Sequence, residues 1–170
     1  MEVIPSFQVD HTNLKPGIYI SRQDAAGGAM FTTYDIRMTA PNKEPAIQPA
    51  AMHTIEHIAA TYLRNDDMWK DLVIYWGPMG CMTGSYLIVK GTYDCEIIRK
   101  LMIRTMEFIV DFEGDVPGNT PDACGNYLMH DLPMAKWEAK RYIERLKTEF
   151  CCEYDLLKRA DINGMAFHDA

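Results

Sequence analysis

The apolar positions of this chain fall into seven segments that follow two different periods. Short runs of β-branched and aromatic residues bounded by turn residues predict strands, and longer stretches with apolar positions three and four apart predict helices. We predict strands at residues 17–21, 30–39, 72–76 and 85–91, and helices at 50–64, 95–111 and 133–150. Strands and helices do not alternate strictly, which favours an α+β fold over a doubly wound parallel sheet. The expected architecture is a single-domain two-layer sandwich, with a mostly antiparallel four-stranded sheet packed against helices.

The helix predicted at 95–111 has the clearest local signals. Asp94 stands immediately before it and is a residue type that caps helix N-termini. One face of this helix carries an apolar stripe, which is typical of a face packed in the core. The stripe consists of Ile98, Leu101, Met102, Thr105 and Ile109.

Length and composition indicate one cytoplasmic domain. The 170 residues are 48% hydrophobic, which is enough for a single core without disulfides, and the five cysteines form no small disulfide framework. We find no apolar leader and no run of about 20 apolar residues that could span a membrane. The net charge of −7 argues against nucleic acid as a partner.

The most informative motif is the run His53-Thr54-Ile55-Glu56-His57. In a helix, His53 and His57 lie on one face and can bind one metal ion, while Glu56 lies beside that face, within reach of a bound water or substrate. On its own the motif is equally compatible with a solvated helix face. Apolar and small flanking residues indicate a partly buried helix, in which such a pair needs partners.

Two cysteines are candidates for the chemistry of such a site. Cys124 lies in a turn-rich stretch and could complete a His/His/Cys site with one open position, although a small buried side chain is the commoner role for a lone cysteine. Cys81 lies in the Gly-rich connection 77–84 between two predicted strands. Its thiol there is a candidate acid, base or nucleophile, because nearby N–H groups or a metal could lower its pKa.

Six blocks in register show a resemblance to the S-ribosylhomocysteine lyases, the LuxS family of bacterial autoinducer-2 synthases. The resemblance covers about residues 3–150, and residues 151–170 look like a polar C-terminal tail outside the lyase-like domain 1–150. The blocks are Phe7-x-x-Asp10-His11, Tyr34-Asp35-Ile36-Arg37, Pro41-Asn42, His53-Thr54-Ile55-Glu56-His57, Pro78-Met79-Gly80-Cys81-x-Thr83-Gly84 and Cys124-Gly125-Asn126-Tyr127.

The resemblance implies a homodimeric metalloenzyme with its site at the dimer interface. It implies cleavage of the thioether of S-ribosyl-L-homocysteine to L-homocysteine and 4,5-dihydroxypentane-2,3-dione, by carbonyl migration along the ribose and β-elimination. By similarity, one divalent ion per subunit is held by His53, His57 and Cys124; the ion is Fe²⁺, which Zn²⁺ or Co²⁺ can replace. Cys81 and Glu56 are then the groups that transfer protons.

Four further positions match polar residues of the family's substrate pocket. Ser6, His11 and Arg37 correspond to positions near the ribose, and Arg64 to one near the homocysteine end. Taken alone, Arg37 fits a solvated strand face, and Arg64 fits a helix C-terminus, where a cation is favourable without any function.

The chain departs from the family where Tyr75-Trp76-Gly77 replaces the commoner Asp-Ile-Ser. The family's aspartate helps to hold the amino-acid end of the substrate, and a tyrosine cannot supply that charge. Recognition there could use the tyrosine hydroxyl, backbone carbonyls or a cation–π contact with Trp76.

Two other classes of protein share part of this pattern. His-x-x-Glu-His is also the signature of inverted zinc peptidases, which are larger and usually take a glutamate as third ligand. A non-catalytic metal-binding protein, with Cys81 in a structural role, is the other alternative. Release of homocysteine from S-ribosylhomocysteine separates the lyase from both.

Overall fold

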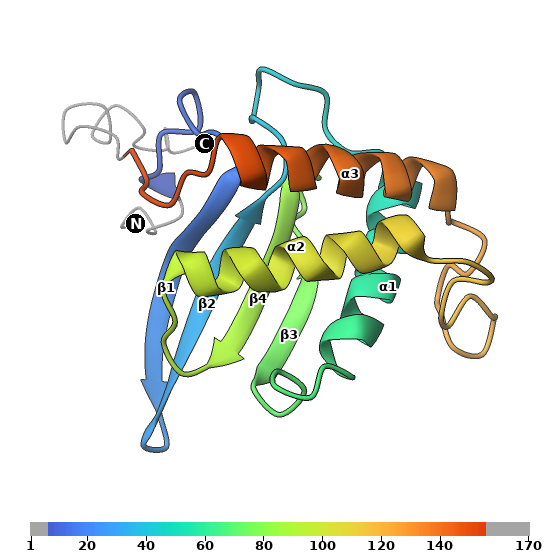
Figure 1. Cartoon of the computed structure of the whole chain (residues 1–170), viewed down its shortest axis with the longest axis horizontal. Coiled ribbons are helices and arrows are strands. Elements are labelled where there is room, and N and C mark those ends of the chain that lie inside the picture. The colour runs from blue at the N-terminus through green and yellow to red at the C-terminus, as the bar shows by residue number, and fades with distance from the viewer. Residues whose placement is uncertain (1–6, 156–170) are drawn as a thin grey trace, which may run out of the picture.

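The computed structural model describes residues 7–155, and its centre is a four-stranded antiparallel sheet (Figure 1). The strands are β1 (Gly17–Ala26), β2 (Ala29–Arg37), β3 (Val73–Pro78) and β4 (Gly84–Lys90), in the spatial order β1-β2-β4-β3. The helices are α1 (Pro49–Leu63), α2 (Cys95–Asp111) and α3 (Leu132–Thr148). The predicted α+β class and all seven elements are confirmed.

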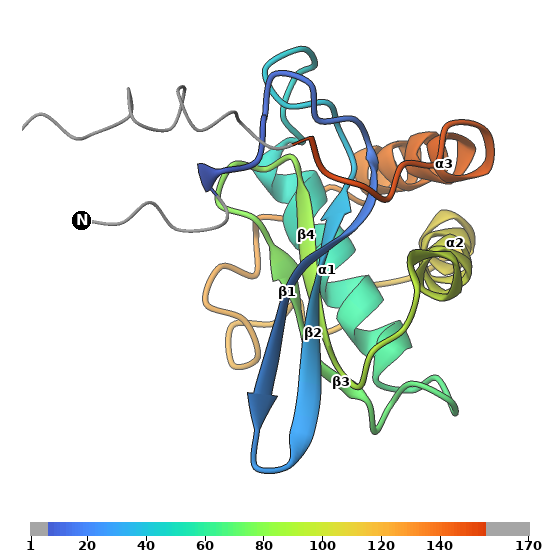
Figure 2. The same ribbon diagram turned by 90° about the vertical axis from the view of Figure 1, so that its left-hand side faces the viewer.

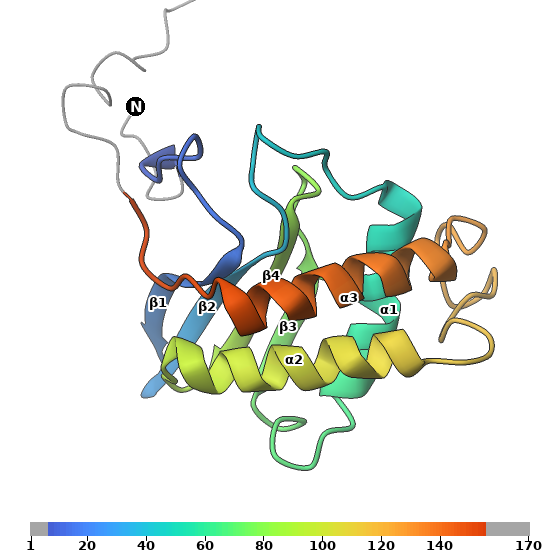
Figure 3. The same cartoon turned by 45° about the horizontal axis from the view of Figure 1, so that its top comes forward.

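The helices gather on one side of the sheet, as Figure 2 shows with the sheet seen nearly edge-on. Helices α2 and α3 run side by side across that face, and α1 lies at the β3 end of the sheet (Figures 1 and 3). No helix formed by residues 7–155 covers the opposite face of the sheet. This leaves one face of the strands available for function.

Alternation along β2 sends neighbouring residues to opposite faces of the sheet. Tyr34 and Ile36 are fully buried in the core beneath the helices. Asp35 and Arg37 therefore point to the face without helices, although both are also buried, at 2% and 3% exposure. A buried pair of charged side chains on this face indicates a functional site and not a solvated strand face.

Helix α2 follows its sequence signals closely. The carboxylate of Asp94 accepts a hydrogen bond from the backbone N–H of Ile97 at 2.9 Å, which confirms the predicted N-cap. Every residue of the predicted stripe is buried, and Met106 joins it. The helix is thus fixed at its start by a cap and along its length by packing.

Strand β1 is longer than predicted, because it continues to Ala26 where we expected it to end at residue 21. Its second half is polar and mostly exposed, so apolar alternation does not mark it. The hairpin with β2 explains the extension: Gly27 and Gly28 both have positive φ, at 57° and 76°, which suits the tight turn that joins two paired strands.

The termini lie partly outside the described residues. Ser6 and residues 156–170 of the predicted polar tail fall there. Residues 151–155 follow α3 and run back toward the N-terminal segment near Asp10 (Figures 1 and 3). Within residues 7–155, no helix is both long and apolar enough to cross a bilayer.

Candidate metal centre

Helix α1 presents the two predicted histidines from one face while its other face is buried. Met52, Ile55 and Ile58 pack into the core, and His53 and His57 on the remaining surface are half-buried. The long connection between α2 and α3 lies beside α1 and carries Cys124 (Figures 1 and 3). The helix therefore supplies two donors, and a loop distant in sequence supplies the third.

These side chains form a compact cluster of metal donors. One ligand atom from each of His53, His57, Cys124 and His130 lies within 4.8 Å of the others. Cys124 Sγ is 3.4 Å from His53 Nε2, and the rings of His53 and His57 meet edge to face with centroids 4.5 Å apart. The predicted His/His/Cys set is thus brought together.

The outer nitrogens of both predicted ligands are held by backbone carbonyls. His53 Nδ1 lies 2.8 Å from the carbonyl oxygen of Met129, and His57 Nδ1 lies 2.7 Å from that of Pro117. A carbonyl only accepts, so each ring donates its Nδ1–H and keeps the Nε2 lone pair free for the cluster. Metal-binding histidines in proteins are oriented in this way. Two such imidazoles and a thiol fit a divalent transition metal.

His130 is a fourth member of the cluster that the sequence analysis missed. Its ring stacks on that of His53 with centroids 4.3 Å apart, and its Nδ1 lies 3.2 Å from Thr54 Oγ1. The Thr54 hydroxyl donates to the carbonyl of Ala50, so His130 donates its Nδ1–H to Thr54. Its Nε2 is then a buried acceptor without a hydrogen-bond partner in residues 7–155. The position of His130 six residues after Cys124 was the available signal.

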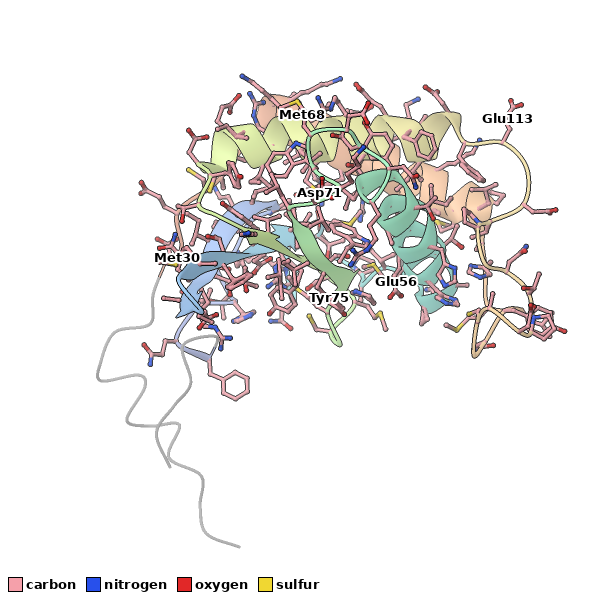
Figure 4. All side chains as sticks on the ribbon, turned by 90° about the horizontal axis from the view of Figure 1, so that it is seen from below. Met30, Glu56, Met68, Asp71, Tyr75 and Glu113 are labelled. Atoms are coloured by element: carbon pink, nitrogen blue, oxygen red, sulfur yellow. The ribbon has the colours of Figure 1, made fainter. Side chains whose placement is uncertain are left out.

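Glu56 lies on α1 between the two histidines and is half-buried. Figure 4, which views the molecule from below, places Glu56 on the side away from α2 and α3, together with Tyr75 of β3. This is the side of the uncovered sheet face. Glu56 is not a member of the cluster of four donors.

A second group of predicted residues lines a cavity of about 670 Å³ at the end of the sheet. His11 of the N-terminal segment, Arg37 at the end of β2 and Cys81 of the β3–β4 turn all contribute to its wall. None of the four metal donors does. Within one chain, the thiol of Cys81 and the four clustered donors therefore belong to two separate groups.

The surroundings of Cys81 favour its thiolate. Arg37 Nη1 donates to Thr83 Oγ1 and lies 3.8 Å from Cys81 Sγ, so the Thr83 hydroxyl can direct its own proton to the sulfur, 3.0 Å away. Burial alone would raise the pKa of Cys81, but the hydrogen bonds of Thr83 and the charge of Arg37 lower it overall. The lowered pKa allows the Cys81 thiolate to act as a base.

Arg64, predicted near the homocysteine end, is engaged with the backbone of β3. Its guanidinium donates to the carbonyl of Ile74 at 2.9 Å and to that of Val73 at 3.4 Å. These bonds fix the end of α1 against the edge strand. They account for Arg64 structurally and leave its predicted role in binding a ligand without support from the geometry.

At residues 75–77, where the sequence departs from the family pattern, the side chain of Tyr75 lies over Gly77. A Cβ added at Gly77 would lie 2.0 Å from the hydroxyl of Tyr75, so the tyrosine folds back into space that a serine would occupy. Trp76 is in the core, at 5% exposure, and Tyr75 is 46% exposed. The suggested cation–π contact with Trp76 is wrong, because its ring is packed in the core; Tyr75 is the exposed aromatic at this position.

The comparisons with known proteins all identify the same family. The family model described as S-Ribosylhomocysteinase (LuxS) matches residues 4–151. Over 146 residues, or 86% of this chain, an S-ribosylhomocysteine lyase of Phocaeicola vulgatus is 58% identical and one of Porphyromonas gingivalis is 56% identical. A lyase of the same name from Borreliella burgdorferi is 49% identical over the same length. The alignments cover 91%, 92% and 93% of those relatives, respectively. Sequence, fold and site thus agree that the chain belongs to the S-ribosylhomocysteinase (LuxS) family.

Proposed function

We propose that this chain is a metal-dependent S-ribosylhomocysteine lyase, which releases L-homocysteine and 4,5-dihydroxypentane-2,3-dione. The observation that carries the proposal is the donor cluster, in which two imidazoles with fixed Nδ1–H groups meet a thiol beside Glu56. Membership of the family supports the same substrate.

In the proposed enzyme, His53, His57 and Cys124 hold one divalent ion, with Fe²⁺ as the native metal and Zn²⁺ or Co²⁺ as substitutes. When bound, such an ion supplies a Lewis acid that polarises the oxygens of the sugar. Four protein donors would fill a tetrahedral site and leave no open position. The proposal therefore requires His130 to stay outside the coordination shell, where it stacks on His53 and orders that ring.

Cys81 and Glu56 perform the proton transfers in this proposal. The Cys81 thiolate, with its lowered pKa, removes the proton from the carbon next to the carbonyl, and Glu56 in its protonated form gives a proton to the carbonyl oxygen. The Glu56 carboxylate then takes the proton of the neighbouring hydroxyl and the Cys81 thiol protonates the former carbonyl carbon, so both groups return to their starting state. Repetition moves the carbonyl from C1 to C3 of the ribose. Removal of the C4 proton then expels homocysteine from C5 as a thiolate, which takes up a proton.

The cavity residues His11 and Arg37, with Ser6 from outside the described part of the chain, are proposed to bind the ribose. Arg37 is held by Asp35, so its remaining N–H groups keep a fixed direction. Arg64 is proposed for the homocysteine end, where it would have to bind ligand while retaining its bonds to β3.

A second copy of the chain would complete the site. Phe31, Ile88, Ile74 and Tyr75 make the uncovered sheet face apolar, and the last two are each 46% exposed. An apolar sheet face of this kind is typical of an interface. Since none of the four clustered donors lines the cavity of Cys81, we propose a homodimer in which the two groups of residues meet across subunits.

The test is release of free homocysteine from S-ribosylhomocysteine by the metal-loaded protein, measured with a thiol reagent. Cys81→Ala and Glu56→Gln should abolish release and retain the metal, whereas His57→Ala should lose both. His130→Ala should keep its metal content. Absence of homocysteine from the wild-type reaction would leave a peptidase or a non-catalytic metal-binding protein as the alternatives.

A further inference from the structure

Residues 151–155, which two residues separate from the end of α3, pack on β1 and on the segment that precedes it. The backbone N–H of Ile18 donates to the carbonyl of Cys151 at 3.0 Å, and the N–H of Asp10 donates to that of Asp155 at 2.8 Å. A Cβ at Gly17 would lie 2.3 Å from the Cys151 oxygen, so glycine is needed for this approach. The segment is therefore attached at both ends, and its course is fixed.

This attachment places Tyr154 in the wall of the Cys81 cavity. Its ring stacks on that of Tyr19, with centroids 4.6 Å apart and planes 9° from parallel. Its hydroxyl donates to Asp35 Oδ2 at 2.9 Å. Burial and the nearby carboxylate raise the pKa of Tyr154, so the hydroxyl stays a neutral donor at physiological pH. The match to the family ends at residue 151, three residues before this tyrosine.

Asp35 connects Tyr154 to the residues around the thiol. Its carboxylate receives Arg37 Nε at 3.1 Å and Nη2 at 2.6 Å, and both side chains are only 3% exposed. The third nitrogen, Nη1, reaches Thr83 and lies 3.8 Å from Cys81 Sγ. A continuous series of contacts thus runs from the hydroxyl of Tyr154 to the sulfur of Cys81.

We propose that Tyr154 is a positioning residue for Cys81, acting through Asp35 and Arg37. Its hydroxyl fixes the orientation of the carboxylate and takes up part of the negative charge on it. Arg37 then keeps its direction, and its positive charge is less fully compensated where it faces the thiolate. The proposal rests on the proposed function, since positioning of Cys81 matters for turnover only if that thiolate transfers protons.

Among residues 7–155, three other titratable groups line the cavity, namely His11, Glu44 and Tyr86. Glu44 forms an ion pair with Arg145, and Tyr86 lies on β4 opposite Asp35. A change at Tyr154 leaves these groups in place. A shift in the behaviour of Cys81 can then be assigned to the contacts through Asp35.

The experiment compares Tyr154→Phe with Tyr19→Phe in the full-length, metal-loaded protein. Each variant keeps an aromatic ring in the stack and loses one hydroxyl; that of Tyr19 donates to the carbonyl of Lys15, outside the series of contacts. The rate at which iodoacetamide modifies Cys81, followed by mass spectrometry of its peptide, is measured from about pH 5 to pH 10. We expect Tyr154→Phe to shift the profile to higher pH and to slow modification near neutrality about three- to tenfold. Tyr19→Phe should follow the wild type.

A Tyr154→Phe profile that overlays the wild type would overturn the proposal, as would an equal shift in Tyr19→Phe. Gly17→Ala provides a second perturbation, since it displaces the same segment without changing Tyr154, and it should shift the profile in the same direction. Circular dichroism confirms that each variant is folded. The rate of Cys81 modification can be measured without turnover of a substrate. If the wild type released no homocysteine, the lyase proposal would be overturned, but the effect of Tyr154 on Cys81 would still be measured.

Discussion

Removal of Asp35 should destabilise the protein far more than removal of an exposed partner in a similar ion pair. The side chains of Asp35 and Arg37 are each 3% exposed, and their closest atoms are 2.6 Å apart. Asp35→Ala would remove the carboxylate that pairs with a buried guanidinium, at a cost of about 3–5 kcal/mol. For a domain of this size, that corresponds to a fall in Tm of roughly 6–20 °C. Asp35→Asn keeps an acceptor for one N–H and should lie between Asp35→Ala and the wild type.

The matched control is Asp24→Ala, which breaks the Arg22–Asp24 pair. The two atoms are 2.7 Å apart there, but the side chains are 67% and 46% exposed. Solvent screening limits such a pair to about 0–1 kcal/mol. Urea unfolding at one protein concentration and one metal content gives both free energies. If Asp35→Ala came within about 1 kcal/mol of Asp24→Ala, the argument from burial would be refuted.

Three further predictions concern single residues. Iodoacetamide at neutral pH should modify Cys81 well before Cys95, because burial raises the pKa of Cys95 to about 11 while the pKa of Cys81 is lowered; equal rates would contradict both directions. Because folding lowers the pKa of Cys81, its thiolate stabilises the folded protein, and the free energy of unfolding should differ most between wild type and Cys81→Ala above about pH 8.5. This difference should disappear as the pH falls through the lowered pKa of Cys81. Asp94→Ala should lower the free energy of unfolding by about 1 kcal/mol, measured in urea, since it removes the cap of α2; no change would mean that the cap adds nothing to the packing of that helix.

Local sequence determined most elements because their signals lie within one turn or one strand. The bounds of α2 were predicted correctly at 95–111, where a cap and an apolar stripe agree. The second half of β1 was missed because its polar residues are held by pairing with β2, a contact that no local period records. The spacing of His53 and His57 likewise follows from the helical period alone.

Tertiary structure decided which distant residues share a site. The chain carries His130 far from α1 in sequence, yet the loop after α2 stacks it on His53. Tyr154 reaches Asp35 across 119 positions because Gly17 lets residues 151–155 pass against β1. The sequence by itself therefore determined the helices, the strands and the paired donors on one helix face. The fourth histidine and the contacts that reach Cys81 depended on long-range packing, because no local pattern specifies which loops meet.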